Sequence, residues 1–372
     1  MEARLLGKFR VSGSRQGRLP FLDWMRGVAA IIMLQGHTFH SFATEQARKE
    51  GPYNLSQFFG GIGPAIFLFL TGITFGFIMY SSERKGLSLW SRWTSALYRA
   101  RYLFILAFLF RFQMWAFSFG QSPWTDLLKV DVLNCMGLTM LVLSPLALLA
   151  LEQRAGWAVV AGVVLAALSP VVSAVNWSFL PTPVRDYFVP SLDHFAFFPW
   201  SAFLAFGVAA GSILRMVKAD DMNRLMQWTA LGGFGLYLSA QYFSNLPYSI
   251  YPAADFWLNS PALIFIKLGV VMLIASAAYL WVHYVVRDRW SWVTQLGTTS
   301  LLVYWVHIEI VYGRWFGFWK DRLNGAECAT YAVILILAML GLSVMRTRWK
   351  GMRLPEWATG AAVLNPRRVS GD

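Results

Sequence analysis

The sequence predicts an all-α protein, a polytopic integral membrane bundle of about ten helices that forms one domain over residues 1–372. Three observations predict it. The chain is 57% hydrophobic and only 14% charged, whereas a soluble domain carries about 25% charged residues. Its apolar residues fall in blocks of roughly twenty, the length that crosses a bilayer as a helix. The basic residues behind the net charge of +13 cluster between these blocks, where they set membrane topology.

The predicted helices alternate in direction with the charges between them. Basic residues crowd every second connecting segment, for example Arg84 and Lys85, and such segments face the cytoplasm. We therefore expect both termini in the cytoplasm, with short basic tails at 1–19 and 346–372, and we expect the chain in a bacterial cytoplasmic (inner) membrane. The first block lacks a small-residue cleavage site and is expected to be retained. The predicted spans are 20–42, 56–80, 97–118, 130–151, 156–176, 193–215, 225–244, 260–284, 292–313 and 326–345.

Two spans carry glycine pairs, and tryptophans flank many of the others. Glycines four residues apart, at 72 and 76 in the second span and at 207 and 211 in the sixth, favour close helix approach. The tryptophans have the placement of an interfacial belt. Cys135 and Cys328 lie in or beside apolar blocks and define neither a disulfide framework nor a zinc spacing. We therefore expect no metal.

The first span is the most informative because it carries an acid, a base and a histidine. Ionisable groups in the hydrocarbon region cost several kcal/mol unless they are paired, buried or hydrated, so they indicate functional sites. Asp23 and Arg26 are three residues apart and share a helix face. They are either an architectural pair or an anion-binding arginine tuned by its acid. His37 lies eleven residues after Arg26, about 16 Å further along the helix axis.

Other polar residues gather at the depth of His37, in the outer half of the bundle. We infer a polar cavity there, reachable from the extracytoplasmic side. Arg111 could instead form a structural ion pair with Asp131 or Glu309, and His40 and His194 could be idle interfacial rings. The residues at this depth are His37 and His40 in the first span, Arg111 and Gln113 in the third, Asp131 and Asn134 opening the fourth, Asp193 and His194 opening the sixth, and His307 and Glu309 in the ninth.

Several segments resemble one family. Leu22-Asp23-Trp24-Met25-Arg26-Gly27, followed by His37, resembles the first-helix signature of membrane acyltransferases related to heparan-α-glucosaminide N-acetyltransferase. The segments 63–72, 108–113, 130–137, 198–211 and 296–307 resemble later helices of that family. The resemblance implies transfer of an acetyl or other small acyl group from cytoplasmic acyl-CoA to an extracytoplasmic sugar or amino-sugar acceptor. The acyltransferase-3 and glucan-succinylating families share the Asp-x-x-Arg-Gly opening, so acyl group and acceptor stay open.

The chain departs from the family pattern at its histidines. The eukaryotic enzyme has asparagine where His37 stands, and its catalytic histidine follows in the next loop, whereas residues 43–55 contain no histidine. His37 or His40 would have to serve as the base. We expect His37 in that role because the pKa of a free imidazole lies near neutral pH. Arg111 would stabilise the oxyanion or orient the acceptor.

The remaining predicted site residues are expected to support His37 and Arg111. Asp131 or Glu309 would hold the histidine or the arginine in place, and Arg26 with the cytoplasmic basic residues would bind the phosphates of the acyl-CoA co-substrate. The expected partners are acyl-CoA, a sugar or glycan acceptor and the lipid bilayer, without nucleic acid; the oligomeric state, a homodimer among the options, stays open. The predicted catalytic residues are His37, Arg111, Asp131, His307 and Glu309, and the predicted substrate-binding or donor-binding residues are Asp23, Arg26, His40, Gln113, Asn134 and His194.

A transporter or exporter of a small polar or lipid-linked molecule is the alternative. Buried histidines and acids also make proton relays. The sequence shows no internal repeat of the kind that builds many transporters, although Pro64, Pro145 and Pro199 interrupt predicted helices.

The predicted orientation can be tested by cysteine labelling. The connection 245–259 contains no Lys or Arg and is expected outside. In a background without Cys135 and Cys328, a cysteine at Ser249 should react with an impermeant thiol reagent in intact cells, and one at Ser88 only after lysis. The reverse pattern would place the histidines in the cytoplasmic leaflet and would exclude transfer across the membrane.

Overall fold

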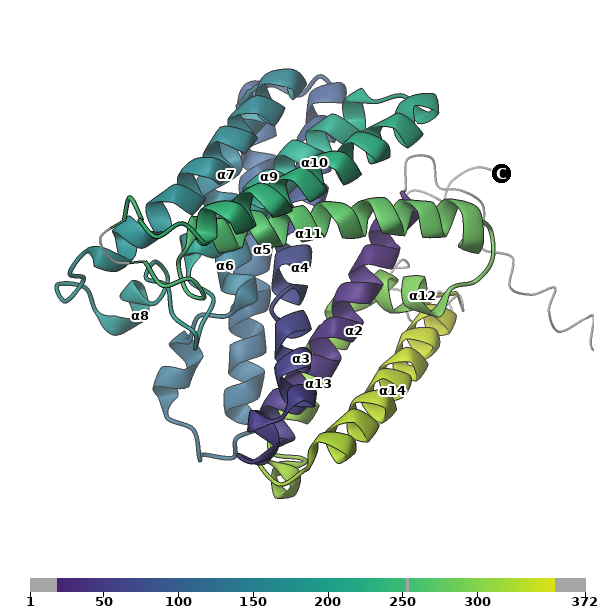
Figure 1. Ribbon diagram of the computed structural model, residues 1–372. Helices are drawn as coiled ribbons and strands as arrows, with labels where there is room; N and C mark the ends of the chain where they lie inside the picture. Colours follow the sequence, from purple (N-terminus) through teal and green to yellow (C-terminus); the bar gives the residue numbers. More distant parts are fainter. Residues whose placement is uncertain (1–18, 252–253, 352–372) are drawn as a thin grey trace, which may run out of the picture.

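The computed structural model describes residues 19–251 and 254–351 and is built from helices (Figure 1). Within these residues no strand occurs beyond one isolated bridge between Ala43 and Leu323. The α-helices are α2 (Pro20–Phe42), α3 (Gly51–Gly60), α4 (Gly63–Arg84), α5 (Leu89–Ala116), α6 (Val132–Leu143), α7 (Leu151–Ala174), α8 (Thr182–Arg185), α9 (Phe197–Met216), α10 (Met222–Ser244), α11 (Pro261–Leu280), α12 (Trp292–Thr298), α13 (Ser300–Tyr312) and α14 (Gly325–Gly351). Short 3₁₀ or π turns are η1 (Ala47–Lys49), η2 (Trp124–Leu128), η3 (Ser144–Leu148), η4 (Ala219–Asp221), η5 (Trp281–Val286) and η6 (Gly317–Trp319).

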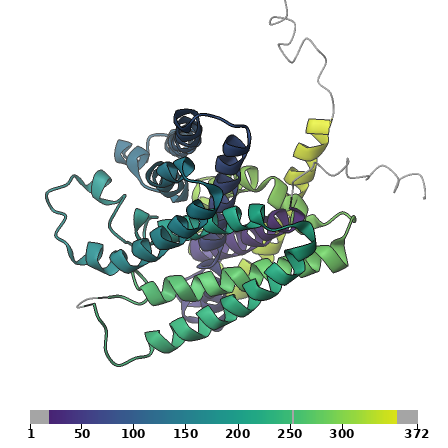
Figure 2. The same cartoon turned by 90° about the horizontal axis from the view of Figure 1, so that it is seen from above.

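The helices pack as a bundle around α4 and α9. These two helices contact each other extensively, α7 lies on α9, and α5 pairs with α6. α10 and α11 run side by side along one edge, as Figure 2 shows from above. α2 packs against α12, α14 and α4. The main core contains fully buried aromatic and aliphatic side chains from α4 and α9, among them Ile66, Phe75 and Phe203.

All ten predicted spans fall on helices, but the count of about ten is not confirmed. Six helical segments are long and apolar enough to cross a membrane, by length and composition alone: 51–84, 124–148, 151–174, 197–216, 261–286 and 325–349. Four predicted spans do not meet this criterion. Polar and charged side chains interrupt those in α2, α5 and α10; α5 alone contains Arg92, Arg99, Arg101 and Arg111. The span 292–313 is divided between α12 and α13, each shorter than a spanning helix. The apolar segments nevertheless identify an integral membrane protein.

Three predicted boundaries were wrong. The span 292–313 is broken into α12 and α13 at Thr299, whose backbone is not helical (φ −120°, ψ 20°). The Gln295 carbonyl, which the Thr299 N–H would use in an α-helix, accepts from Ser343 Oγ of α14 (2.9 Å). The span 130–151 ends as an α-helix at Leu143, before Pro145, which cannot continue a helix. The start at 193 is also wrong, because α9 begins at Phe197 and Phe198 is extended before Pro199.

The C-terminal boundary and the tails also differ from expectation. The predicted tail 346–372 begins within a helix, since α14 extends to Gly351. Residues 1–18 and 352–372, which make up most of the two predicted tails, lie outside the described residues.

The predicted glycine contact is confirmed, and it joins α4 to α9. A Cβ added to Gly72 would lie 2.1 Å from the carbonyl oxygen of Leu204, and one added to Gly207 would lie 2.1 Å from that of Phe69. The two backbones are therefore closer than any side chain permits. In a bilayer, where lipid tails are as apolar as side chains, such close van der Waals packing is what holds helices together.

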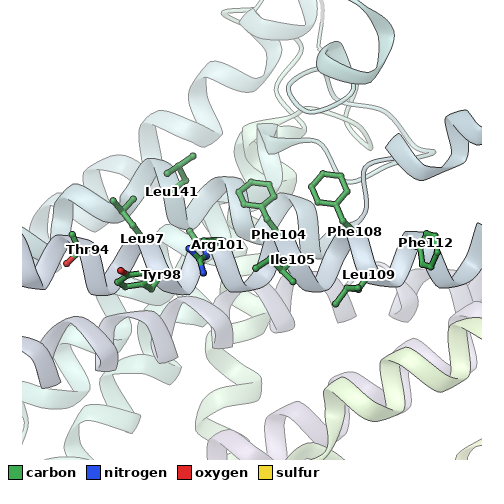
Figure 3. A pocket seen from close by; sticks show the side chains of 11 residues that line it. Thr94, Leu97, Tyr98, Arg101, Phe104, Ile105, Phe108, Leu109, Phe112 and Leu141 are labelled. Carbon is green, nitrogen blue, oxygen red and sulfur yellow. The ribbon is translucent and has the colours of Figure 1, made fainter.

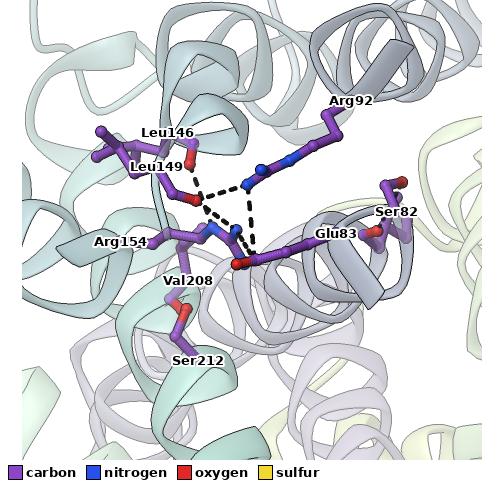
Figure 4. A network of polar contacts seen from close by, with 9 residues as sticks. Ser82, Glu83, Arg92, Leu146, Leu149, Arg154, Val208 and Ser212 are labelled. Atoms are coloured by element: carbon purple, nitrogen blue, oxygen red, sulfur yellow. Dashed lines mark hydrogen bonds and ion pairs between the residues drawn. The ribbon is translucent and has the colours of Figure 1, made fainter. Parts of the chain in front are cut away.

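A buried guanidinium joins α7 to α4 and η3 (Figure 4). Arg154 was placed in the connection 152–155, but it lies in the first turn of α7 and is fully buried. Its Nη2 lies 2.5 Å from Glu83 Oε2 and donates to the carbonyl of Leu149 at 2.8 Å, and its Nε donates to that of Leu146. Arg92 of α5 also donates to the Leu149 carbonyl, at 2.6 Å. These charged donors satisfy carbonyls that a helix end leaves without partners.

Because the backbones of α4 and α9 touch at Gly72, we expect that even the methyl group of alanine is too large there. Gly72→Ala should cost about 1–3 kcal/mol, the usual range for overpacking a filled interior, and should lower the melting temperature in detergent. Gly341→Ala is the matched control, because nothing lies within 4 Å of its added Cβ. That substitution should be neutral or stabilise by up to about 1 kcal/mol through helix propensity. Equal melting temperatures for the two variants would contradict the close contact.

Candidate functional site

Two histidines form the centre of the candidate site. His37 lies in α2 and His307 in α13, and their rings stack with centroids 5.2 Å apart. His37 Nδ1 is 3.0 Å from His307 Nε2. His307 is fully buried, and its Nδ1 is 2.9 Å from the carbonyl oxygen of Val303, one turn earlier. Both rings therefore belong to one hydrogen-bonded chain.

The direction of this chain follows from chemistry. A carbonyl oxygen only accepts, so Nδ1 of His307 carries the proton and donates to Val303. With a neutral ring, His307 Nε2 then accepts, and the proton between the two rings belongs to His37 Nδ1. His37 is left with an unprotonated Nε2. Fixing one nitrogen of an imidazole in this way prepares the other to act as a base.

The close approach of α2 and α12 brings α13 to this place. A Cβ on Gly27 would lie 1.9 Å from the carbonyl oxygen of Val293, and one on Gly297 would lie 1.8 Å from that of Asp23. Only glycine fits at both positions. Because α13 follows α12 after the break at Thr299, this contact determines where His307 meets α2. The glycines of the Asp-x-x-Arg-Gly and Leu-Gly-Thr segments thus have a packing role.

Arg111 and Asp131 form the second element of the site. Arg111 Nε of α5 lies 3.3 Å from Asp131 Oδ2, an ion pair without hydrogen-bond alignment. Asp131 also caps α6, because its Oδ1 accepts from the backbone N–H groups of Leu133 and Asn134. Asn134 Nδ2 donates to the hydroxyl of Tyr187 at 2.9 Å. The cap holds Asp131, and Asp131 in turn holds Arg111 beside α13.

A polar pocket of about 500 Å³ opens beside these residues, between α5 and the segment from α13 to η6. Arg111, Lys129, Arg314 and Lys320 bring four positive charges to its lining, against the carboxylates of Asp126 and Glu309. Tyr312 lines the pocket, and its ring packs edge-on against His37 with centroids 5.2 Å apart. Tyr312 is therefore the side chain between the pocket and the histidine pair.

Other polar groups fix the walls of this pocket. Glu309 Oε1 accepts from the indole N–H of Trp315 at 3.1 Å, and Gln113 accepts from the indole of Trp305. Lys320 Nζ donates to the Tyr312 carbonyl at 2.8 Å, and burial, aided by the charge of Arg314, lowers the pKa of Lys320. Glu309 Oε2 is buried and, within the described residues, has no hydrogen-bond partner. The site thus holds both an oriented acid and excess positive charge.

The structure separates the other predicted residues from this centre. Asp23 and Arg26 pair at 2.9 Å near the opposite end of α2, and Arg26 Nη2 donates to Thr74 of α4 at 2.7 Å. His40 is exposed, and its ring lies 6.2 Å from that of Tyr312. His194 lies before α9, not within it, and contacts the Val189 carbonyl of its own loop.

Tyr312 and Lys320 were missed by the sequence analysis. Tyr312 lies three residues after Glu309 and so shares a helix face with it, which is a signal that could have found it. Lys320 lies in the segment that folds back after α13, and no local pattern indicates that return. Within residues 19–251 and 254–351, no group of three or more His, Cys, Asp or Glu side chains could hold a metal ion.

Titratable side chains buried among apolar helices define an integral membrane protein with a polar site at one end of its bundle. The family model for the catalytic region of heparan-α-glucosaminide N-acetyltransferase matches residues 18–242, and the chain belongs to this family of membrane acetyltransferases. No curated protein gives a significant match. The matched region includes Asp23, Arg26, His37, Arg111 and Asp131, whereas α13 with His307 and Glu309 lies beyond it.

The two roles of Asp131 can be separated by substitution. Asp131→Asn keeps an N-cap but removes the charge, whereas Asp131→Ala removes both, and should cost about 1 kcal/mol more for the lost cap. Repeating both changes in an Arg111→Gln background should abolish the cost of Asp131→Asn and keep the additional cost of Asp131→Ala. Unfolding of the purified protein in detergent measures wild type, Arg111→Gln and the four Asp131 variants. An equal cost of Asp131→Asn in both backgrounds would show that the ion pair contributes nothing.

Proposed function

We propose that this protein transfers an acetyl group, or another small acyl group, from cytoplasmic acyl-CoA to a sugar or amino-sugar acceptor on the extracytoplasmic side. Membership of the acetyltransferase family supports the reaction class. The observation that carries the proposal to particular residues is the hydrogen-bonded chain from Val303 through His307 to His37. It leaves an unprotonated nitrogen on His37, which is what deprotonation of an acceptor hydroxyl or amine requires.

His37 is the general base of this reaction. Its Nε2 takes the proton as the acceptor oxygen or nitrogen attacks the thioester carbonyl carbon. The C–S bond of the thioester then breaks, and the departing CoA thiolate recovers the proton. His307 keeps the His37 ring in its orientation throughout, as a positioning residue, because its own Nδ1 stays bonded to the Val303 carbonyl.

Arg111 stabilises the charge that develops on the thioester oxygen. Asp131 faces its Nε, so the terminal nitrogens of the guanidinium remain for the pocket that Arg111 lines. Fixed positive donors beside an apolar bundle act strongly on an oxyanion because little water competes with them. Glu309 and Tyr312 shape the acceptor end of the same pocket, and Gln113 lies behind it against Trp305.

The acyl donor approaches from the opposite end of α2. Arg26 is 26% exposed in its side chain and is oriented by Asp23 and Thr74, as an anion-binding arginine would be. The basic residues of the predicted cytoplasmic segments would bind the CoA phosphates in the same way. This arrangement matches both termini in the cytoplasm of a bacterial cell with the protein in its inner membrane.

Replacement of the base is the test of this function. His37→Ala should lower acetyl-CoA-dependent transfer to amino sugars, measured as CoA release, by at least about a hundredfold, the usual contribution of a general base. His283→Ala is the matched control, because His283 is exposed in η5 and stacks on Tyr279 away from the site. Undiminished turnover by His37→Ala would exclude His37 as the base.

The same protein preparations distinguish an enzyme from an exporter. Acetyl-CoA should raise the melting temperature of both wild type and His37→Ala through mass action, because donor binding does not need the base. A transporter that uses the buried histidines as a proton relay would gain no stability from CoA compounds and would release no CoA.

A further inference from the structure

An apolar groove of about 850 Å³ runs along the face of α5 that points away from the bundle core (Figure 3). It extends from Thr94 to Phe112, about 27 Å at the usual helical rise, which is close to the hydrocarbon thickness of a bilayer. Its walls are mostly apolar side chains, such as Ile105 and Leu109 of α5 and Leu141 of α6, and Thr94 and Arg101 line its first part. The groove is as long as the whole hydrocarbon core is thick, so a hydrocarbon chain longer than one leaflet would fill it.

The groove ends about one helical turn from the polar pocket of the candidate site, although the two share no lining residue. Phe112 lines the last part of the groove, and Trp115 lines the pocket. Their rings pack with centroids 6.2 Å apart. Arg111, the residue next to Phe112, also lines the pocket. One face of α5 therefore presents a long apolar channel that ends beside a polar pocket with excess positive charge.

We propose that the acceptor is a lipid-linked sugar, with its hydrocarbon chain in the α5 groove and an anionic phosphate-sugar head in the polar pocket. This rests on the proposed function and specifies its substrate class. The charges support it. Arg111 faces Asp131 and Lys129 pairs with Asp126, which leaves Arg314 and Lys320 against Glu309 and so an excess of positive charge that attracts an anionic head. A soluble sugar would use only the pocket and would leave the adjoining groove without a role.

The role of the groove is to position the phosphate-sugar head group of the acceptor. Lipid tails are as apolar as the groove, so moving a chain into it releases little free energy. Holding the chain along α5 instead keeps the sugar beside Arg111 and raises its effective concentration at the reacting atoms. The sugar hydroxyl or amine forms a bond to the thioester carbonyl carbon, the C–S bond breaks, and the proton passes through His37 to the CoA thiolate. No other reactant is needed.

Two acceptors with one head separate the contributions of groove and pocket. Glucosamine 1-phosphate esterified with a long alkyl chain is compared with its methyl ester, with radiolabelled acetyl-CoA, in the same detergent. Wild type should have a kcat/KM at least about tenfold higher for the long-chain ester, as expected when a substrate is held in place. Leu109→Trp, which fills the groove at a side chain that is 52% exposed, should remove this preference and leave the methyl ester rate unchanged.

The matched control fills a lipid-facing position outside the groove. Leu231→Trp on α10, where the exposed side chain (63%) lies outside the groove lining, should keep the preference for the long-chain ester whatever surrounds α10. Equal rates for the two esters in wild type, or equal effects of Leu109→Trp and Leu231→Trp, would overturn the proposal.

A binding measurement with the long-chain ester distinguishes failure of the lipid-groove proposal from failure of the proposed acyltransferase function. If neither ester is acetylated, native mass spectrometry of wild type and Leu109→Trp with the long-chain ester still decides on the groove. Retention of the ester by wild type and its loss from Leu109→Trp support the groove as a lipid site even when acyl transfer fails. Equal retention, or none by wild type, refutes it. Acetylation of both esters at one rate supports the enzyme and rejects the groove.

Discussion

The contact between the backbones of α2 and α12 governs the geometry of the whole site. Gly27 and Gly297 let the two helices approach until carbonyl groups occupy the space of side chains. α13 follows α12 directly, so this one interface decides which residue of α13 faces His37. A larger residue at either glycine would push α12 outward and take His307 with it. The motif glycines are thus as much a part of the site as the histidines.

Where the two histidines meet, their hydrogen bonds determine which ring nitrogens carry protons. The Val303 carbonyl can only accept, which orders the two imidazoles and leaves one nitrogen of His37 without a proton. No carboxylate is needed to orient His37 in this arrangement. The acids serve other groups: Asp131 caps α6 and faces Arg111, and Glu309 accepts from Trp315. An imidazole oriented by a second histidine suits an apolar surrounding, because a neutral partner avoids the cost of burying another charge.

The sequence predicted the helical class and several members of the site, for reasons that can be stated. Ionisable residues in apolar segments are conspicuous, so His37, Arg111, His307 and Glu309 could be selected without a structure. The charge pattern predicts their depth in the membrane. Their neighbours could not be predicted, because periodicity within one helix says nothing about which distant helix it faces. His37 and His307 are 270 residues apart, and the contact that joins them depends on two glycines in other turns.

The features that the sequence analysis missed also have identifiable causes. The break at Thr299 was missed because the apolar pattern continues through it, while the competing hydroxyl belongs to Ser343 on another helix. Arg154 was assigned to a connection because a charge beside an apolar block usually marks a helix end, yet buried carbonyls and Glu83 surround it. Tyr312 was overlooked because an aromatic residue in an apolar helix is indicated only by a polar neighbour on the same face, here Glu309. Tertiary partners decided all three cases.

The burial of Arg154 has a consequence for motion within the bundle. A guanidinium keeps its charge at every physiological pH, so no change of protonation can release its contacts with Glu83 and the carbonyls of Leu146 and Leu149. Arg92 binds one of the same carbonyls. The end of α4, the start of α5, η3 and the start of α7 therefore form a joint that a change of pH does not open, which leaves the other helices to move when substrate is admitted.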